Sequence, residues 1–189
     1  MSEPIKRGAT YADLMELPEN VVGEIIGGDL FASPRPRLGH ARLQLVLGGR
    51  VQSAFGERGG GAHADGWWLL SEPELRFGSD TLVPDIAGWR RTRMPELPAE
   101  APWATLAPDW VCEVLSPGTA RLDRVRKLPL FAREGVGHAW LVDPAARTLE
   151  VYRLESGLWV VAAVHGGDER VRPEPFAAAE FDLADWWTG

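Results

Sequence analysis

The chain has 189 residues, of which 45% are hydrophobic and 25% charged, a composition that predicts one globular domain over residues 1–189. Its single cysteine, Cys112, excludes an intrachain disulfide and the zinc sites built from several cysteines. Without a long apolar run or the apolar segment of a signal peptide, we expect a cytoplasmic protein with no membrane partner. The formal net charge of −7 argues against a protein that coats nucleic acid with its whole surface, but not against a local basic groove.

The first third of the chain predicts a helix, a hairpin and a longer helix. Thr10 followed by Asp13 is typical of a helix start, and Pro18 ends that helix. Residues 21–33, VVGEIIGGDLFAS, predict two strands joined at their Gly-Gly pair. Apolar residues at helical spacing then predict a helix over about 38–57.

The rest of the chain predicts mostly strands. They cover GWWLLSEPELRFG, TLVPDIAGWR, DWVCEVLS, HAWLVDP, TLEVYRL and LWVVAAVH, in that order. Residues 93–108 contain several prolines and predict a loop, and residues 119–134 predict a helix capped by Gly135. The tail FDLADWW predicts either a strand remnant or a short helix. We therefore expect an α/β or α+β domain rich in strands.

A glutamate interrupts the most apolar of these strands. In WVCEVLS, Glu113 alternates with Val111 and Leu115, so it shares their buried face. Burying an unpaired carboxylate there would lower the stability of the fold by roughly several kcal/mol, because the charge loses its hydration. A salt bridge, a shared proton or a metal ion could each relieve that cost.

A second acid and an unusual lysine are candidates for the same site. Asp85 follows Pro84 in TLVPDIAGWR, where a proline predicts a strand start or a bend that would turn Asp85 toward the next strand. Lys127 lies on the helix after the Glu113 strand, in a chain with 18 arginines and only two lysines. A compact ammonium suits contact with a water or a phosphate oxygen. A divalent cation between Asp85 and Glu113 would relieve both their repulsion and the burial of Glu113.

These motifs carry a resemblance. The order PDI, CEVLS, an aspartate at 123 and a lysine at 127 resembles the PD-(D/E)XK nuclease superfamily and, within it, the Uma family of restriction endonucleases. GEIIGGDL resembles that family's early hairpin, and SPGTARLDRVRKLPLFAREGV and AWLVDP its later segments. Gly27 and His138–Ala139 depart from the family pattern, and Leu115 stands where the superfamily often has its lysine.

The resemblance implies a restriction-endonuclease-like core, a mixed central β-sheet flanked by helices, with an extra N-terminal β-hairpin. It also implies a metal-dependent endonuclease that hydrolyses DNA. Asp85, Glu113 and Glu24 would hold Mg²⁺ or Mn²⁺, ions that prefer carboxylate and water oxygens. In this family the catalytic lysine comes from the next helix, and Lys127 would be that residue.

DNA is the expected partner, and the sequence leaves both a monomer and a homodimer open. Arg90, Arg124 and Arg126 are candidates for contacts with backbone phosphates. His40 falls where the family often has a histidine at the start of its first long helix, and it is a further candidate for DNA contact.

Plainer interpretations remain open. Glu113 and Lys127 could form a structural salt bridge, and Asp123 could be a helix-surface residue paired with Lys127 at four-residue spacing. The arginine groups could be solvated faces, and His40 could be structural. The whole fold could be a catalytically inactive module that binds nucleic acid or a protein partner. An intact set of buried acids favours the enzyme over that module.

Overall fold

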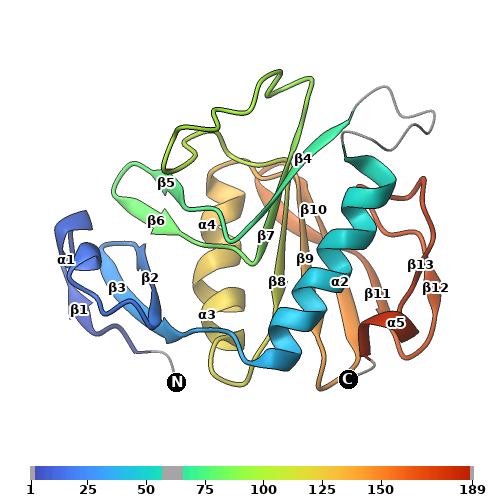
Figure 1. The fold of residues 1–189 in the computed structure, drawn as a ribbon, viewed down its shortest axis with the longest axis horizontal. Helices are drawn as coiled ribbons and strands as arrows, with labels where there is room; N and C mark the ends of the chain where they lie inside the picture. The colour runs from blue at the N-terminus through green and yellow to red at the C-terminus, as the bar shows by residue number, and fades with distance from the viewer. Residues whose placement is uncertain (1–2, 57–65, 188–189) are drawn as a thin grey trace.

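The computed structural model describes residues 3–56 and 66–187. Its main layer is a six-stranded sheet in the order β11-β10-β9-β8-β7-β4 (Figure 1). The strands are β4 (Trp67–Ser71), β7 (Ile86–Arg90), β8 (Trp110–Val114), β9 (His138–Asp143), β10 (Thr148–Glu155) and β11 (Leu158–Gly166). Strands β8 and β9 are parallel and all other neighbours are antiparallel, which confirms the expected mixed central sheet.

A second sheet contains the predicted hairpin. Its order is β1-β3-β2-β6-β5, and its strands are β1 (Lys6–Arg7), β2 (Val21–Ile26), β3 (Asp29–Pro34), β5 (Leu75–Phe77) and β6 (Asp80–Leu82). Gly27 and Gly28 form the hairpin turn with φ angles of +62° and +80°, a region that glycine enters at little cost. Next to this sheet lies α1 (Tyr11–Met15), whose start is fixed by a hydrogen bond from the Thr10 amide to the Asp13 carboxylate at 2.8 Å.

Two of the predicted strands divide between the two sheets. Residues 66–78 form β4 and then β5, and residues 81–90 lie in β6 and then β7. The chain leaves the first sheet at Pro73 and the second at Pro84, because a proline has no N–H to donate to a ladder. The bend before β7 therefore confirms the expectation for Val83–Pro84–Asp85.

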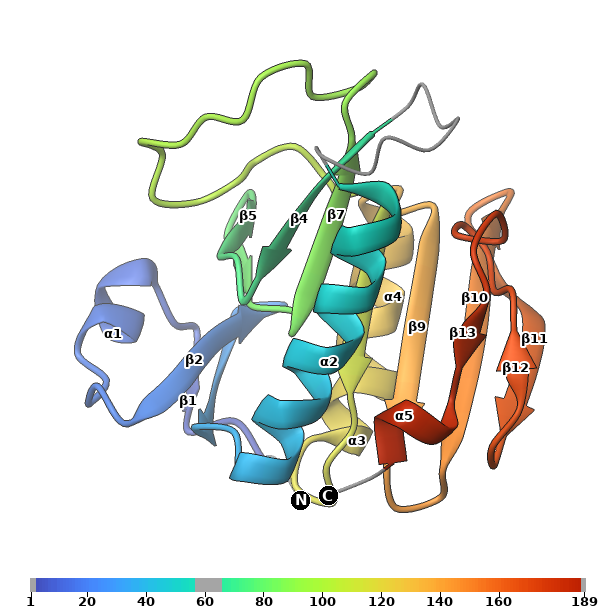
Figure 2. The ribbon, with the colours of Figure 1, turned by 45° about the vertical axis from the view of Figure 1, so that its right-hand side comes forward.

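Helices cover both faces of the six-stranded sheet (Figures 1 and 2). On one face, α2 (Leu38–Phe55) packs Leu47 and Val51 in the same core as Trp110 and Cys112 of β8. The other face carries a helical segment made of α3 (Ala120–Leu122), η1 (Asp123–Lys127) and α4 (Leu128–Arg133). Alternation along β8 therefore turns Glu113 away from α2 and toward the helical segment that contains Lys127.

The helical segment predicted over 119–134 contains one π-helical turn. The Leu128 amide donates to the carbonyl of Asp123, five residues back instead of four. Pro129 follows at once, and its ring would clash with the carbonyl of residue 125 in a regular α-helix. The wider turn avoids that clash and leaves both Asp123 and Lys127 buried. Gly135, with φ +79°, ends the helix as predicted.

The C-terminal tail packs against the core between α2 and the six-stranded sheet. It forms both of the elements expected, a strand and a short helix: β12 (Arg170–Val171) pairs with β13 (Phe181–Asp182), and α5 (Ala184–Trp187) follows. Trp186 of α5 is 2% exposed and packs in the core beside Trp140. Within residues 3–56 and 66–187, no helix has the length and apolar character that crossing a membrane requires.

Candidate active site

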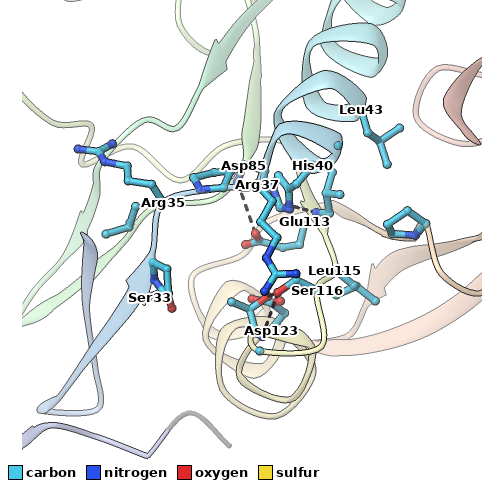
Figure 3. Close-up of a pocket in the computed structure, with 18 of the residues that line it drawn as sticks. Ser33, Arg35, Arg37, His40, Leu43, Asp85, Glu113, Leu115, Ser116 and Asp123 are labelled. Atoms are coloured by element: carbon cyan, nitrogen blue, oxygen red, sulfur yellow. Dashed lines mark hydrogen bonds and ion pairs between the residues drawn. The ribbon is translucent and has the colours of Figure 1, made fainter. Parts of the chain in front are cut away.

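A pocket of about 680 Å³ opens between α2 and the helical segment that carries Lys127 (Figure 3). Its floor lies at the ends of β7 and β8, and its rim includes the segment 34–37 between β3 and α2. The pocket is lined by all of the residues predicted to be catalytic and by two acids that were not, Glu72 and Asp123; the predicted residues are Glu24, Asp85, Glu113 and Lys127.

Lys127 is the centre of an ion-pair cluster. Its side chain is 4% exposed, and its Nζ lies 2.7 Å from Oε1 of Glu113, 3.0 Å from Oε1 of Glu24 and 3.9 Å from Oδ1 of Asp123. Nζ also donates to the carbonyl of Val83 at 3.2 Å. Burial alone would lower the pKa of this ammonium, but the three carboxylates raise the pKa well above its ordinary value. Lys127 is therefore a permanent positive charge inside the protein.

Glu113 is the least satisfied of the acids. Oε2 accepts a long hydrogen bond of 3.4 Å from the Asp85 amide. Oε1 is close to Lys127, but the contact lacks hydrogen-bond geometry, so this buried oxygen accepts no hydrogen bond from the described residues. Burial raises the pKa of Glu113 well above its usual range, and the attraction of Lys127 only partly opposes that shift. Oε1 is thus held by the charge of Lys127, and Oε2, with only its long hydrogen bond, is the oxygen that a further cation could approach.

Asp85 is held in place by three elements. The register of β7 and β8 pairs Ile86 with Cys112, which puts Asp85 beside Glu113. Oδ2 of Asp85 accepts a hydrogen bond of 2.6 Å from the Val114 amide, and Oδ1 lies 2.9 Å from Nε2 of His40. The Asp85 side chain is 15% exposed, so this acid lies nearer to solvent than Glu113.

Two α2 side chains support Asp85. Burial lowers the pKa of His40, but the hydrogen bond and charge of Asp85, with the charges of Glu72 and Asp123, more than offset that and raise the pKa. One helical turn later, Gln44 donates from Nε2 to the Asp85 carbonyl at 2.7 Å and to Ser71 Oγ at 2.8 Å. Nothing in the sequence pattern singled out Gln44; its four-residue spacing from His40 is the only signal, because both then lie on one face of α2.

Asp123 corrects one expectation. It was expected on the helix surface, but it is 4% exposed and lies in the cluster, because the π-helical turn directs it inward. Burial raises the pKa of its carboxyl to about 6 despite the attraction of Lys127, and the charges of Glu24 and Asp85 raise it further. The four-residue spacing from Lys127 did predict the contact, which is 3.9 Å, but not its burial.

Comparison with known proteins identifies the family. The family model of Uma2, described as "Putative restriction endonuclease", matches residues 10–184. The chain belongs to the Uma2 family. Among solved structures, a putative nuclease belonging to DUF820 from Anabaena variabilis is similar, with 25% sequence identity, a TM-score of 0.73, and coverage of 95% of this chain and 97% of that one. No protein of curated function matches.

The acids of this Uma2 chain fit a divalent cation in their chemistry. In the cluster four carboxylates face one ammonium and one histidine, so acids outnumber bases; burial first, and the neighbouring acids after it, raise the pKa values of Glu113 and Asp123. Among the described residues, no three His, Cys, Asp or Glu side chains converge as a ready ligand set. Mg²⁺ needs only one or two carboxylates with waters and substrate phosphate, and Asp85 and Glu113 supply two.

Glu24, expected to help hold the metal, lies on the lysine side of the cluster. Its Oε1 accepts a hydrogen bond of 2.9 Å from the Val83 amide and pairs with Lys127. In this geometry Glu24 orients Lys127, and the same bond fixes the bend that carries Asp85.

The arginines expected to contact DNA phosphates lie outside the pocket, and their role stays a prediction. Arg90, Arg124 and Arg126 do not line the pocket. Arg90 lies over the Trp67 ring at 4.6 Å, and Arg124 pairs with Glu150 at 2.5 Å. The pocket is lined instead by Arg35, Arg37 and Arg42, from the segment before α2 and its first turns. In Figure 3, Arg37 extends into the pocket toward Ser116 and Asp123.

Proposed function

We propose that this Uma2 protein is a metal-dependent endonuclease that hydrolyses phosphodiester bonds of DNA. The single observation that carries the proposal is the convergence of Asp85, Glu113 and Lys127 in one pocket from three separate elements. The family description and the nuclease among the solved structures support the same reaction. A structural salt bridge needs neither a third acid nor an open pocket beside it.

The acids would hold the cation. Asp85 and Glu113 would bind Mg²⁺ or Mn²⁺, which supplies a Lewis acid for the phosphate and a bound water of lowered pKa. His40 and the Val114 amide hold the two oxygens of Asp85 in fixed directions, so this ligand is preorganised. Gln44 holds the backbone of the same residue.

Lys127 would act on the reacting groups. Its ammonium is held charged by the surrounding carboxylates, so it would attract a phosphate oxygen, and it would donate a hydrogen bond to the attacking water in exchange for one of its present contacts. In hydrolysis the water oxygen forms a bond to phosphorus, the bond to the leaving oxygen breaks, and that oxygen takes up a proton. Negative charge on the phosphate grows during this step, and a fixed ammonium in a buried site stabilises it strongly.

The test is cleavage of supercoiled plasmid and of single-stranded DNA by the purified protein with Mg²⁺, with Mn²⁺ and with a chelator. We expect cleavage of at least one substrate, only with a divalent cation, and its loss in Asp85→Asn and Glu113→Gln. Asp168→Asn, a matched change on the exposed surface, should cleave like the wild type. Binding of DNA without cleavage under all conditions would instead support the non-catalytic module.

A further inference from the structure

The reacting groups lie at the bottom of the pocket rather than on an open surface. The side chains of Glu113 and Lys127 are 5% and 4% exposed, whereas Asp85 and His40, nearer to the opening, are 15% and 16% exposed. The pocket volume of about 680 Å³ falls within the roughly 300–1,000 Å³ in which proteins enclose one small ligand. In a duplex each phosphate is held between its neighbours on the surface of a rod, whereas an unpaired nucleotide can turn both its base and its phosphate into a pocket of this size.

One wall of the pocket is suited to a phosphate. Arg37 precedes the first turn of α2 and is exposed, and its side chain makes no hydrogen bond or ion pair with the described residues. The 18-residue helix begins here with no acid in its first turn, so its N-terminal amides attract anions. Gly39 lines the pocket, and open space lies where its side chain would be, so the backbone can be approached.

Another part of the lining is suited to a base. Trp187 lines the pocket and is half-buried. Its ring is fixed by a hydrogen bond from Nε1 to the Gly167 carbonyl at 2.5 Å and by an edge contact with Trp186, with ring centroids 6.0 Å apart. A fixed, partly exposed indole and arginine side chains in the lining of one pocket are the groups by which proteins bind unpaired nucleotides, since every base can stack on an aromatic ring.

We propose that the pocket takes an unpaired nucleotide, so that the substrate is single-stranded DNA or a strand with an unpaired base rather than intact duplex. The base lies against Trp187, one phosphate lies at Arg37 and the start of α2, and the adjoining phosphodiester faces Asp85 and Glu113. This inference rests on the proposed nuclease function, whose substrate class it specifies.

Binding in chelator tests the inference without any cleavage. Fluorescence anisotropy would compare a labelled single strand with the blunt duplex of the same sequence. We expect the single strand to bind at least about tenfold more tightly, as stacking of one base can supply that factor. Equal affinities, or tighter binding of the duplex, would overturn the inference.

Two pairs of variants assign the preference to this pocket. Trp187→Ala should weaken single-strand binding about tenfold and leave duplex binding nearly unchanged, whereas Trp187→Phe, which keeps a ring, should retain most of the affinity. Trp103→Ala, at a 38% exposed tryptophan outside the pocket, is the control for folding and surface effects. Arg37→Ala should weaken binding and reduce its salt dependence by about one counterion, with Arg7→Ala as its control. If Trp187→Ala keeps the preference for the single strand, the base does not bind at Trp187 and the inference is wrong.

Cleavage with Mn²⁺ separates this inference from the proposed function. Faster cleavage of the single strand, lost in Trp187→Ala, supports both. Equal cleavage of both substrates leaves the nuclease standing and overturns the unpaired-nucleotide site. A single-strand preference in binding without cleavage of any substrate leaves the pocket's selectivity standing and overturns the nuclease.

Discussion

Lys127 Nζ lies 2.7 Å from Glu113 Oε1, yet that oxygen accepts no hydrogen bond from the described residues. The lysine is shared with Glu24 and Asp123, so Glu113 is one of three acids that compete for one cation. The relationship therefore has consequences for stability, metal binding and catalysis that can be measured.

Removing the charge of Glu113 should not destabilise the apo protein. Glu113→Gln leaves Lys127 with two acids and removes one buried charge from a cluster with an excess of carboxylates, so we expect unchanged or higher stability, by up to about 1 kcal/mol. Lys127→Met leaves the buried acids without their cation and should cost about 3 kcal/mol or more. Urea melts in chelator measure both. A loss of about 3 kcal/mol in Glu113→Gln would indicate a structural salt bridge.

Metal binding should depend on Asp85 and Glu113. Calorimetry with Mn²⁺ should show one binding event for the wild type, and Asp85→Ala and Glu113→Ala should each abolish it or weaken it by at least about tenfold, as loss of a carboxylate ligand does. The exposed acid Glu100, replaced in Glu100→Gln, is the control. Unchanged affinity in both alanine variants would remove these residues from the metal site.

The compact ammonium of Lys127 should be required for cleavage. Lys127→Arg keeps the charge but replaces a point donor with a wide planar fork. If Lys127 orients a water, this change should lower the cleavage rate by about 100-fold or more and leave DNA affinity nearly unchanged. Cleavage, anisotropy and thermal melts are measured on the same preparation, because Arg is larger than the buried Lys. Full activity in Lys127→Arg would leave an active site built from acids alone.

Asp123 should make the apo protein less stable as pH rises. Its folded-state pKa of about 6 lies above the ordinary 3.8, so its favourable contribution is complete below pH 3.8 and is lost as pH rises through about 6. Charging the buried group costs on the order of 3 kcal/mol. Relative to wild type, Asp123→Asn should therefore gain stability between pH 4 and about pH 7, as measured by urea melts in chelator. A gain that does not change with pH would contradict the raised pKa.

Local patterns in the sequence were sufficient for most of the secondary structure. The two glycines of the hairpin turn, the apolar stripe of α2 and Gly135 at the end of α4 each act over a few residues, so neighbours in the chain decide them. The buried acid in β8 could also be recognised, since alternation along a strand assigns its face whatever the partner is. The scarcity of lysine singled out Lys127 and the family resemblance added Glu24, and both line the pocket with Glu113.

The tertiary structure alone decided which side chains complete the site. His40 and Gln44 reach Asp85 because α2 packs on the sheet with the face that carries both residues turned toward Asp85. The sequence of α2 predicts its apolar stripe but not the partner of each polar residue. Asp123 is buried because Pro129 widens the helix, a distortion whose direction depends on the sheet behind it. Arg37, and not Arg90 or Arg124, faces the acids for a similar reason. Contacts between distant segments depend on how elements pack, and the charge pattern of one segment cannot encode that packing.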